Sequence, residues 1–373
     1  MNESPGAFPT LPTVIPDPDI TQARTLPGSF YTDPALFASQ KDRVFTPSWQ
    51  FITDEATAVR IPGQVYPFTL LEGCLDEPLL LARGTDDAVR CMSNVCTHRG
   101  TLVCEAPGNE RHLRCRYHGR RFALDGTFQF MPEFEACKGF PTEEDNLRRL
   151  PLERLGPLLF TSLAPACPFG EWIRPVIERV GWLPLHEFRL DPSHARDYLV
   201  ACNWALYCEN YLEGFHIPFV HASLNDVLDY GAYATELHEH GSLQLGVSKD
   251  DGGEAVFNLP SISPDTGKRV AAYYFHLWPN LMLNFYPWGL SINVVRPLGV
   301  DRTRVSFIPY VWRPDLLERG AGAGLDRVER EDEAVVEAVQ KGLRSRLYSH
   351  GRYSPTREQG VHHFHRLLAR HAT

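Results

Sequence analysis

Two short segments, CTHRG at residues 96–100 and CRYHG at residues 115–119, each place a cysteine close to a histidine. Cys96 and His98 stand in the first segment, and Cys115 and His118 stand in the second. Two thiols and two imidazoles that recur in this way indicate a metal site. The chain must therefore fold so that two loops, separated by a polar and glycine-containing stretch, meet at one point.

The order of the four ligands distinguishes two kinds of site. A structural zinc ion accepts two cysteines and two histidines, but zinc fingers usually pair cysteine with cysteine and histidine with histidine. Here each loop offers one of each, as a Rieske [2Fe–2S] cluster requires: one iron takes both thiolates and the other takes both imidazoles. Imidazole in place of thiolate raises the reduction potential to about −150 to +300 mV. The pattern favours an electron-carrying cluster over structural zinc.

A second cluster of polar side chains lies in residues 201–224, ACNWALYCENYLEGFHIPFVHASL. Glu213 and His216 fall on the polar side of a helix predicted at 203–216, which by itself indicates only a solvated stripe. His221 follows five residues after His216, and Pro218 between them is expected to break the helix and let both rings meet. Two histidines with one carboxylate form the facial triad of non-haem Fe(II) oxygenases.

The residues CTHRG and CRYHG, followed by FALDG, and the Glu-x-x-His-x4-His pattern together resemble the Rieske non-haem iron oxygenases. The resemblance is to the alpha subunit of the ring-hydroxylating oxygenase family, in its choline and carnitine monooxygenase branch. It extends from about residue 30 to the C-terminus. Two departures are Arg116, where the family often has proline, and Arg120, where it often has tryptophan.

The resemblance implies the roles of further residues. The third iron ligand is expected at Asp332, eight residues before Gln340, with Glu331 and Glu333 as its nearest competitors. Glu213 is expected not to bind iron; it would bridge His216 to His118 of the partner subunit, which implies a homotrimer.

The implied fold is α+β, with an all-β Rieske domain and a helix-grip catalytic domain that contains an antiparallel sheet. We expect an N-terminal arm and helix over 1–45, the Rieske domain over 46–160 and the catalytic domain over 161–373. Leu124–Thr127 is expected to form a hairpin turn, and a second long helix is predicted at 326–348.

The implied cofactors are the Rieske [2Fe–2S] cluster and a mononuclear Fe(II). The sequence has no GxGxxG after a strand and no plant-type cysteine run, so electrons from NAD(P)H are expected to arrive through a separate reductase, with or without a ferredoxin. O2 and a small organic substrate complete the reaction. Other readings are a zinc-stabilised ligand-binding protein and a Rieske electron carrier with a degenerate second site.

The substrate class depends on an aromatic stretch at 272–291. Its rings pack either as strand core, which is the simpler interpretation, or around a quaternary ammonium group by cation–π attraction. Hydroxylation or N-demethylation of a quaternary amine is slightly favoured over aromatic ring hydroxylation. The rings concerned are Tyr273, Phe275, Trp278, Phe285, Tyr286 and Trp288.

Composition excludes several other functions. A net charge of −9 and a pI of about 5.9 argue against nucleic acid or an anionic membrane as partner. Neither a signal peptide nor a membrane-length apolar run is apparent, and nine cysteines indicate a reducing compartment, so we expect a cytoplasmic protein. A basic group near the cluster is either a solvated loop or a docking patch for an electron donor; it comprises Arg111, Arg114, Arg116, Arg120 and Arg121. His362, His363 and His365 are expected on a surface or core helix without metal.

Overall fold

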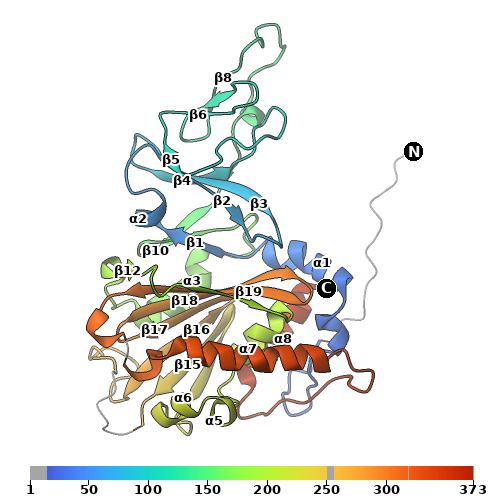
Figure 1. Cartoon of the computed structure of the whole chain (residues 1–373), viewed down its shortest axis with the longest axis vertical. Helices are drawn as coiled ribbons and strands as arrows, with labels where there is room; N and C mark the ends of the chain where they lie inside the picture. The colour runs from blue at the N-terminus through green and yellow to red at the C-terminus, as the bar shows by residue number, and fades with distance from the viewer. Residues whose placement is uncertain (1–14, 250–255, 318, 373) are drawn as a thin grey trace. The chain divides into compact units, whose positions relative to one another are not determined.

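The computed structural model describes residues 15–249, 256–317 and 319–372 and divides into two compact units. The smaller unit contains residues 46–171 and 183–187. The larger contains the chain up to Phe45, residues 172–182 and residues 188 onward. The smaller unit is therefore an insertion in the chain of the larger one (Figure 1). The first part of the predicted arm, residues 1–14, lies outside the described residues.

The smaller unit is built from short antiparallel strands, as the sequence predicts. Its main sheet has the order β5-β2-β3-β4-β9, with β2 Gln64–Leu70, β3 Glu77–Arg83, β4 Val89–Ser93, β5 Gly108–Asn109 and β9 Arg149–Leu150. A second sheet joins β1 Gln50–Asp54, β11 Leu158–Thr161 and β10 Leu152–Leu155, and the short helix α2 spans Glu55–Ala58. A third sheet joins β6 Leu113–Arg114, β7 Arg121–Phe122 and β8 Phe128–Phe130.

The predicted hairpin turn connects β7 and β8. Asp125 accepts a hydrogen bond from the Thr127 amide through Oδ1 (2.9 Å), and the Ala123 amide donates to the Thr127 carbonyl (2.8 Å). Gly126 has φ +87°, which glycine adopts without steric cost. The turn prediction is confirmed.

The larger unit contains one antiparallel sheet in the order β12-β19-β18-β17-β16-β15-β14, with β13 also paired to β19. These strands are β12 Arg189–Leu190, β13 Arg196–Val200, β14 Ala234–His238, β15 Gly241–Val247, β16 Val270–Leu277, β17 Leu281–Tyr286, β18 Gly289–Gly299 and β19 Arg302–Val311. Its helices are α1 Pro34–Gln40, α4 Trp204–Tyr211, α5 Ile217–Val220, α6 Ala222–Val227, α7 Leu325–Gly342 and α8 Gln359–Ala372, and α3 Phe169–Val180 begins in the smaller unit. Figure 1 shows α7 crossing the sheet. Among the described residues, no helix has the length and apolarity needed to cross a membrane.

Two predicted helices differ in length from those observed. The helix expected over 203–216 ends at Tyr211, and the helix expected over 326–348 ends at Gly342. The helix α1 lies within the expected 1–45 segment and begins after Asp33, because the Asp33 carboxylate accepts from the Ala35 amide (2.8 Å) and Pro34 occupies the first position.

The long strands have one face that is rich in polar groups. Gln244 of β15 pairs with Tyr274 of β16, and Tyr274 pairs with Asn284 of β17. Since successive side chains of a strand point to opposite faces, these three lie on one face while Tyr273 and Phe285 lie on the other. One face of the sheet therefore carries a row of hydrogen-bonding side chains that are buried or half-buried in the larger unit.

The three histidines of α8 are held by hydrogen bonds. Nε2 of His362 bonds the Asp17 carbonyl (2.7 Å), and Nε2 of His363 bonds the His238 carbonyl (2.8 Å). His365 lies between the Tyr353 hydroxyl (2.6 Å) and the Glu209 carboxylate (2.9 Å). These contacts tie α8 to other parts of the larger unit.

A further buried histidine gives a prediction about acid stability. His276 of β16 donates from Nε2 to the Pro279 carbonyl (3.1 Å), and burial lowers its pKa from 6.5 to about 4. Between these values the unfolded chain binds a proton that the folded protein does not, so stability falls as the pH drops from 6.5 to 4. We expect this histidine to account for a loss of about 3 kcal/mol. His276→Gln should flatten the pH dependence of the unfolding free energy in this window, and an unchanged slope would exclude the assignment.

Candidate metal centres and substrate cavity

The two Cys-His loops have the same backbone design. In the first, the Gly100 amide donates to the Cys96 carbonyl (3.0 Å), and in the second the Gly119 amide donates to the Cys115 carbonyl (3.1 Å). Both glycines have φ +75°, where a side chain would be strained. Each loop is thereby closed into a tight turn that contains the cysteine and the histidine.

The four predicted cluster ligands lie together. The rings of His98 and His118 are 4.8 Å apart between centroids, and both cysteines are buried. Burial raises the pKa of Cys96, and the hydrogen bond and charge of the neighbouring Cys115 thiol raise it further. Desolvation, followed by the charge of His118, lowers the pKa of His98, which favours the neutral imidazole that metals bind. Two thiols beside two imidazoles fit the donor set of a Rieske cluster.

Arg120 does not belong to the exposed basic group that the sequence suggests. Its side chain is 2% exposed, and Nη2 bonds the Asp145 carboxylate (2.7 Å) and carbonyl (3.0 Å). The guanidinium also lies over three phenylalanine rings at 4.9–5.6 Å, those of Phe122, Phe128 and Phe140. A planar cation can replace an aromatic side chain in such surroundings because it stacks on rings. By contrast, Arg116 is exposed and pairs with Glu105 (3.1 Å).

The second motif is shaped by an early end to α4. Gln244 donates from Nε2 to the Tyr211 carbonyl (2.6 Å) in the last turn of the helix, and the chain then turns at Gly214. A Cβ on Gly214 would lie 2.8 Å from the Tyr233 ring, so glycine is required there. Glu213 accepts from the backbone amides of Phe215 and His216 through Oε2. The break therefore precedes Pro218, contrary to prediction.

Pro218 lies instead within the first turn of α5, where its missing amide proton costs no helical hydrogen bond. His216 immediately precedes α5, and His221 stands between α5 and α6. The short helix thus fixes the spacing of the two imidazoles, whose ring centroids are 5.0 Å apart.

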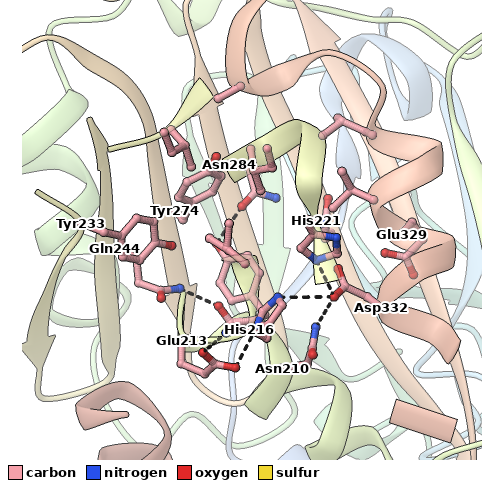
Figure 2. A pocket seen from close by; sticks show the side chains of 18 of the residues that line it. Asn210, Glu213, His216, His221, Tyr233, Gln244, Tyr274, Asn284, Glu329 and Asp332 are labelled. Atoms are coloured by element: carbon pink, nitrogen blue, oxygen red, sulfur yellow. Dashed lines mark hydrogen bonds and ion pairs between the residues drawn. The ribbon is translucent and has the colours of Figure 1, made fainter. Parts of the chain in front are cut away.

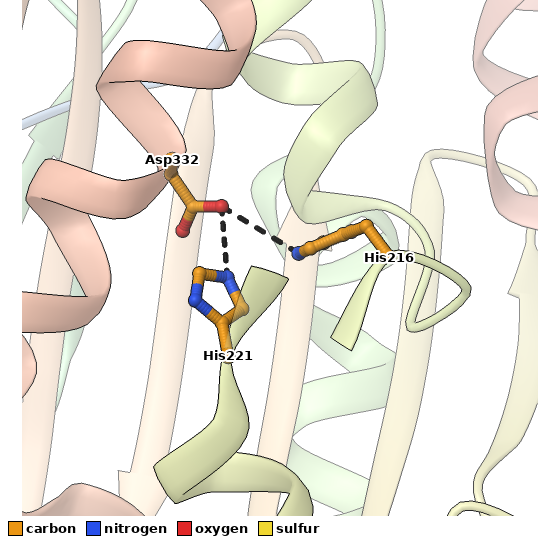
Figure 3. A group of neighbouring side chains, drawn as sticks. All are labelled: His216, His221 and Asp332. Atoms are coloured by element: carbon orange, nitrogen blue, oxygen red, sulfur yellow. Dashed lines mark hydrogen bonds and ion pairs between the residues drawn. The ribbon is translucent and has the colours of Figure 1, made fainter. Parts of the chain in front are cut away.

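Asp332 of α7 completes this site (Figure 3). Its Oδ1 lies 3.0 Å from Nε2 of His221 and 3.5 Å from Nε2 of His216, and the three donor atoms lie within 4.8 Å of one another. Donor atoms at right angles around one ion, with bonds of about 2.1 Å, are about 3 Å apart. Two imidazoles and one carboxylate at this separation can hold an iron ion and leave other positions open. Asn210 further fixes the Asp332 carboxylate by donating to Oδ1 (2.6 Å).

The two acidic competitors of Asp332 point elsewhere. Glu331 bonds the opposite nitrogen of His221, Nδ1, at 2.8 Å, and Arg327 holds the other Glu331 oxygen at 3.1 Å. Glu333 is not a member of the metal-binding group. On His216 the corresponding position is taken by Glu213, whose Oε1 lies 2.7 Å from Nδ1. Each histidine therefore has its own carboxylate behind it, a pattern that fixes ring orientation in metal sites.

A cavity of about 110 Å³ adjoins the three residues (Figure 2). It is lined by α4, α5, α6, α7 and the polar face of the sheet. The lining includes five tyrosines, four amides and three carboxylates, but no lysine or arginine among the described residues: Tyr207, Tyr211, Tyr233, Tyr274, Tyr286, Asn210, Gln244, Asn284, Asn293, Glu213, Glu329 and Asp332. The remaining lining is mainly aliphatic, with Phe307 and the two histidines.

The aromatic stretch at 272–291 packs mainly as strand core and contributes little to the cavity walls. Of the six rings named from the aromatic stretch, only Tyr286 lines the cavity. Tyr273, Phe275 and Phe285 are core residues, as the simpler interpretation predicted. Tyr274 was missed although strand alternation places it on the face opposite to Tyr273. Tyr207 and Tyr211 of α4 also line the cavity, and their hydroxyl groups donate to Glu329 and Asn284.

Comparison with known protein families agrees with both halves of this description. The family model of the Rieske [2Fe-2S] domain matches residues 51–141, and that of the ring hydroxylating alpha subunit (catalytic domain) matches residues 182–373. The chain belongs to the ring-hydroxylating, Rieske non-haem iron oxygenase family, as its alpha subunit.

Individual relatives narrow the resemblance. The chain is 31% identical to choline monooxygenase, chloroplastic, of Arabidopsis thaliana over 94% of this chain and 84% of the relative. It is 28% identical to the carnitine monooxygenase oxygenase subunit of Escherichia coli (strain K12), over 93% of this chain and 94% of that subunit. The fold superimposes on the quaternary ammonium Rieske monooxygenase CntA with a TM-score of 0.78 at 23% identity, and the match covers 98% of this chain and 100% of the CntA chain. For naphthalene 1,2-dioxygenase from Rhodococcus sp. the TM-score is 0.72 at 19% identity, and the match covers 92% of this chain and 93% of the dioxygenase chain.

Membership confirms the expected fold class, the oxygenase activity and the cofactors, which are a Rieske [2Fe–2S] cluster and a mononuclear iron. Electrons reach such oxygenase subunits from a separate donor, and members of the family form oligomers.

Proposed function

We propose that Cys96, His98, Cys115 and His118 hold the Rieske cluster and that His216, His221 and Asp332 hold the mononuclear iron. The observation that carries the second assignment is the convergence of His216 Nε2, His221 Nε2 and Asp332 Oδ1 within 4.8 Å. When bound, the iron supplies the site for O2 activation. The protein fixes the ligands through Asn210 and through the carboxylates behind each imidazole.

The role assigned to Glu331 gives a prediction about iron affinity. Glu331→Gln weakens the contact with Nδ1 of His221, and loss of such a carboxylate partner costs about 10- to 100-fold in metal affinity. The matched control is Glu333→Gln on the same helix, which should leave iron affinity unchanged. Titration of iron-depleted protein with Fe(II) under anaerobic conditions measures both. Equal losses in the two variants would mean that helix charge, rather than His221, sets the affinity.

The substrate is proposed to be a small quaternary ammonium compound that is hydroxylated or oxidatively N-demethylated. The cavity supports this class because it joins tyrosine rings, which attract cations, to carboxylates and lacks a basic side chain in its described lining. Its volume of about 110 Å³ favours a small substrate, of the size of choline. A carboxylate-bearing substrate would meet no lysine or arginine among the described lining residues.

We also propose how electrons arrive. A separate NAD(P)H-dependent reductase would reduce the cluster, and Glu213 would link His216 to His118 of the partner subunit in a ring-shaped homotrimer. The proposed location is the cytoplasm, which nine free cysteines support.

The test combines metal analysis with a substrate screen. Anaerobically purified protein should contain about three iron atoms per chain, with a Rieske-type visible and EPR spectrum. With NADH and a surrogate reductase, choline should stimulate O2 consumption and yield an oxidised product, and carnitine and benzoate should do so less. Analytical ultracentrifugation checks the trimer.

Zinc in a colourless sample would contradict the metal assignment. Turnover of benzoate in preference to every quaternary amine would contradict the substrate class while leaving the metal assignment intact.

A further inference from the structure

One buried carboxyl group in the cavity lining has no role in holding the metal site. Glu329 lies on α7, three residues before Asp332, and is 2% exposed. Its Oε2 accepts a hydrogen bond from the Tyr207 hydroxyl of α4. Its Oε1 is buried and has no hydrogen-bond partner in the protein. A buried acidic oxygen without a partner is costly, so its presence calls for an explanation.

The described residues that line the cavity with Glu329 offer electron-rich groups and include no lysine or arginine. A second buried acceptor in the same cavity lining, Oε1 of Gln244, also has no partner. Figure 2 shows the two residues on different walls of the cavity. A cavity whose unsatisfied groups are both acceptors, and whose described lining lacks lysine and arginine, suits a positively charged occupant.

A quaternary ammonium ion matches these needs without any N–H group. Its positive charge is spread over the methyl hydrogens, which make C–H···O contacts with acceptors and pack on aromatic faces. Burial raises the pKa of Glu329 to about 8, and the negative charge of Asp332 acts in the same direction, against the Tyr207 hydrogen bond. A cation brought next to the carboxyl group would favour its ionised form.

We propose that Glu329 is the counter-ion of the substrate's ammonium group and thereby determines the preference for charged over uncharged substrates. This inference rests on the proposed function, because it takes the substrate to be a quaternary amine. Tyr207 would position the carboxylate through its hydroxyl group.

The experiment compares two ligands of the same shape. These are choline and its uncharged analogue, in which a carbon atom replaces the nitrogen. Dissociation constants are measured by calorimetry on the iron-loaded holoenzyme under anaerobic conditions, for wild type, Glu329→Gln and Glu333→Gln. Glutamine keeps the size of the side chain and an oxygen for Tyr207, but carries no charge.

We expect wild type and Glu333→Gln to bind choline at least about tenfold more tightly than the analogue, and Glu329→Gln to lose that preference through weaker choline binding alone. Such a loss is about 1.4 kcal/mol. Parallel weakening of both ligands would indicate a structural role and overturn the proposal, as would an unchanged preference. If wild type neither binds nor oxidises choline, glycine betaine or carnitine, the proposed function itself fails. If it oxidises one of them and Glu329→Gln keeps the charge preference, only the counter-ion role fails.

Discussion

Asp332→Asn is expected to reduce the iron content from about three to about two atoms per chain and to abolish substrate oxidation, while the Rieske spectrum is retained. The carboxylate oxygen that lies 3.0 Å from His221 and 3.5 Å from His216 is the one that also accepts from Asn210. Asparagine supplies no negative charge to the iron, and if its amide nitrogen faces Asn210 two donors oppose each other. Because changes behind a ligand already cost 10- to 100-fold, we expect a loss of activity greater than about 100-fold.

The measurements are iron content, the EPR signal of the reduced cluster and turnover with the reductase. Asp326→Asn is the matched control, since Asp326 lies on the same helix but bonds Tyr198 (2.6 Å) and Arg330 (3.2 Å). It should retain all iron and most activity. Full iron content in Asp332→Asn would assign the third ligand elsewhere.

Glu213→Gln has the second largest expected effect. Like Glu331→Gln it should lower iron affinity, so it is assayed with Fe(II) in excess, where both metal centres are occupied. Both oxygens of this carboxylate accept hydrogen bonds: Oε1 faces His216 Nδ1 (2.7 Å), and Oε2 faces the amides of Phe215 and His216. Glutamine has one acceptor oxygen, so one of these contacts must become a donor–donor contact. If Glu213 also links the two metal centres, turnover should fall by about 100-fold, equivalent to about 2.7 kcal/mol.

The informative readout is the rate at which the reduced cluster becomes oxidised after mixing with O2 and substrate in a stopped-flow instrument. Glu213→Asp keeps the charge and both acceptors on a shorter arm, so it should retain more activity than Glu213→Gln. A Gln variant whose cluster is oxidised at the wild-type rate would rule out a bridging role. Failure to bind iron even with Fe(II) in excess would instead limit the role of Glu213 to the support of His216.

The sequence was sufficient for the features that depend on residue type and short spacing. The two Cys-His loops and the hairpin at Leu124–Thr127 each involve groups a few residues apart, where local chemistry dictates geometry. The pairing of Glu213 with His216 was expected from the family resemblance. Asp332 was expected from the family resemblance, and it lies beside both histidines although more than one hundred residues separate it from them.

Features that depend on tertiary contacts were not accessible in this way. The end of α4 at Tyr211 depends on Gln244, a residue of a distant strand. The cavity walls depend on which face of β16 meets the helices, and neither Tyr274 nor Glu329 carries a local signal of that contact. An arginine in a basic segment also looks exposed by composition, although Arg120 is enclosed by rings and by Asp145.

The enclosure of Arg120 limits how this cluster domain could be recombined with those of its relatives. If the two Cys-His loops were transplanted together with Arg120 into a host that lacks Asp145 and the three phenylalanines, the guanidinium would lie unpaired in an apolar interior, at a cost of about 3–5 kcal/mol. Conversely, a host's tryptophan placed at position 120 would leave the Asp145 carboxylate without its cation. The smallest segment that can be exchanged with its contacts intact therefore extends from residue 96 to residue 145. Chimeric oxygenases in which the whole domain is exchanged should be more stable than those in which only the loops are grafted.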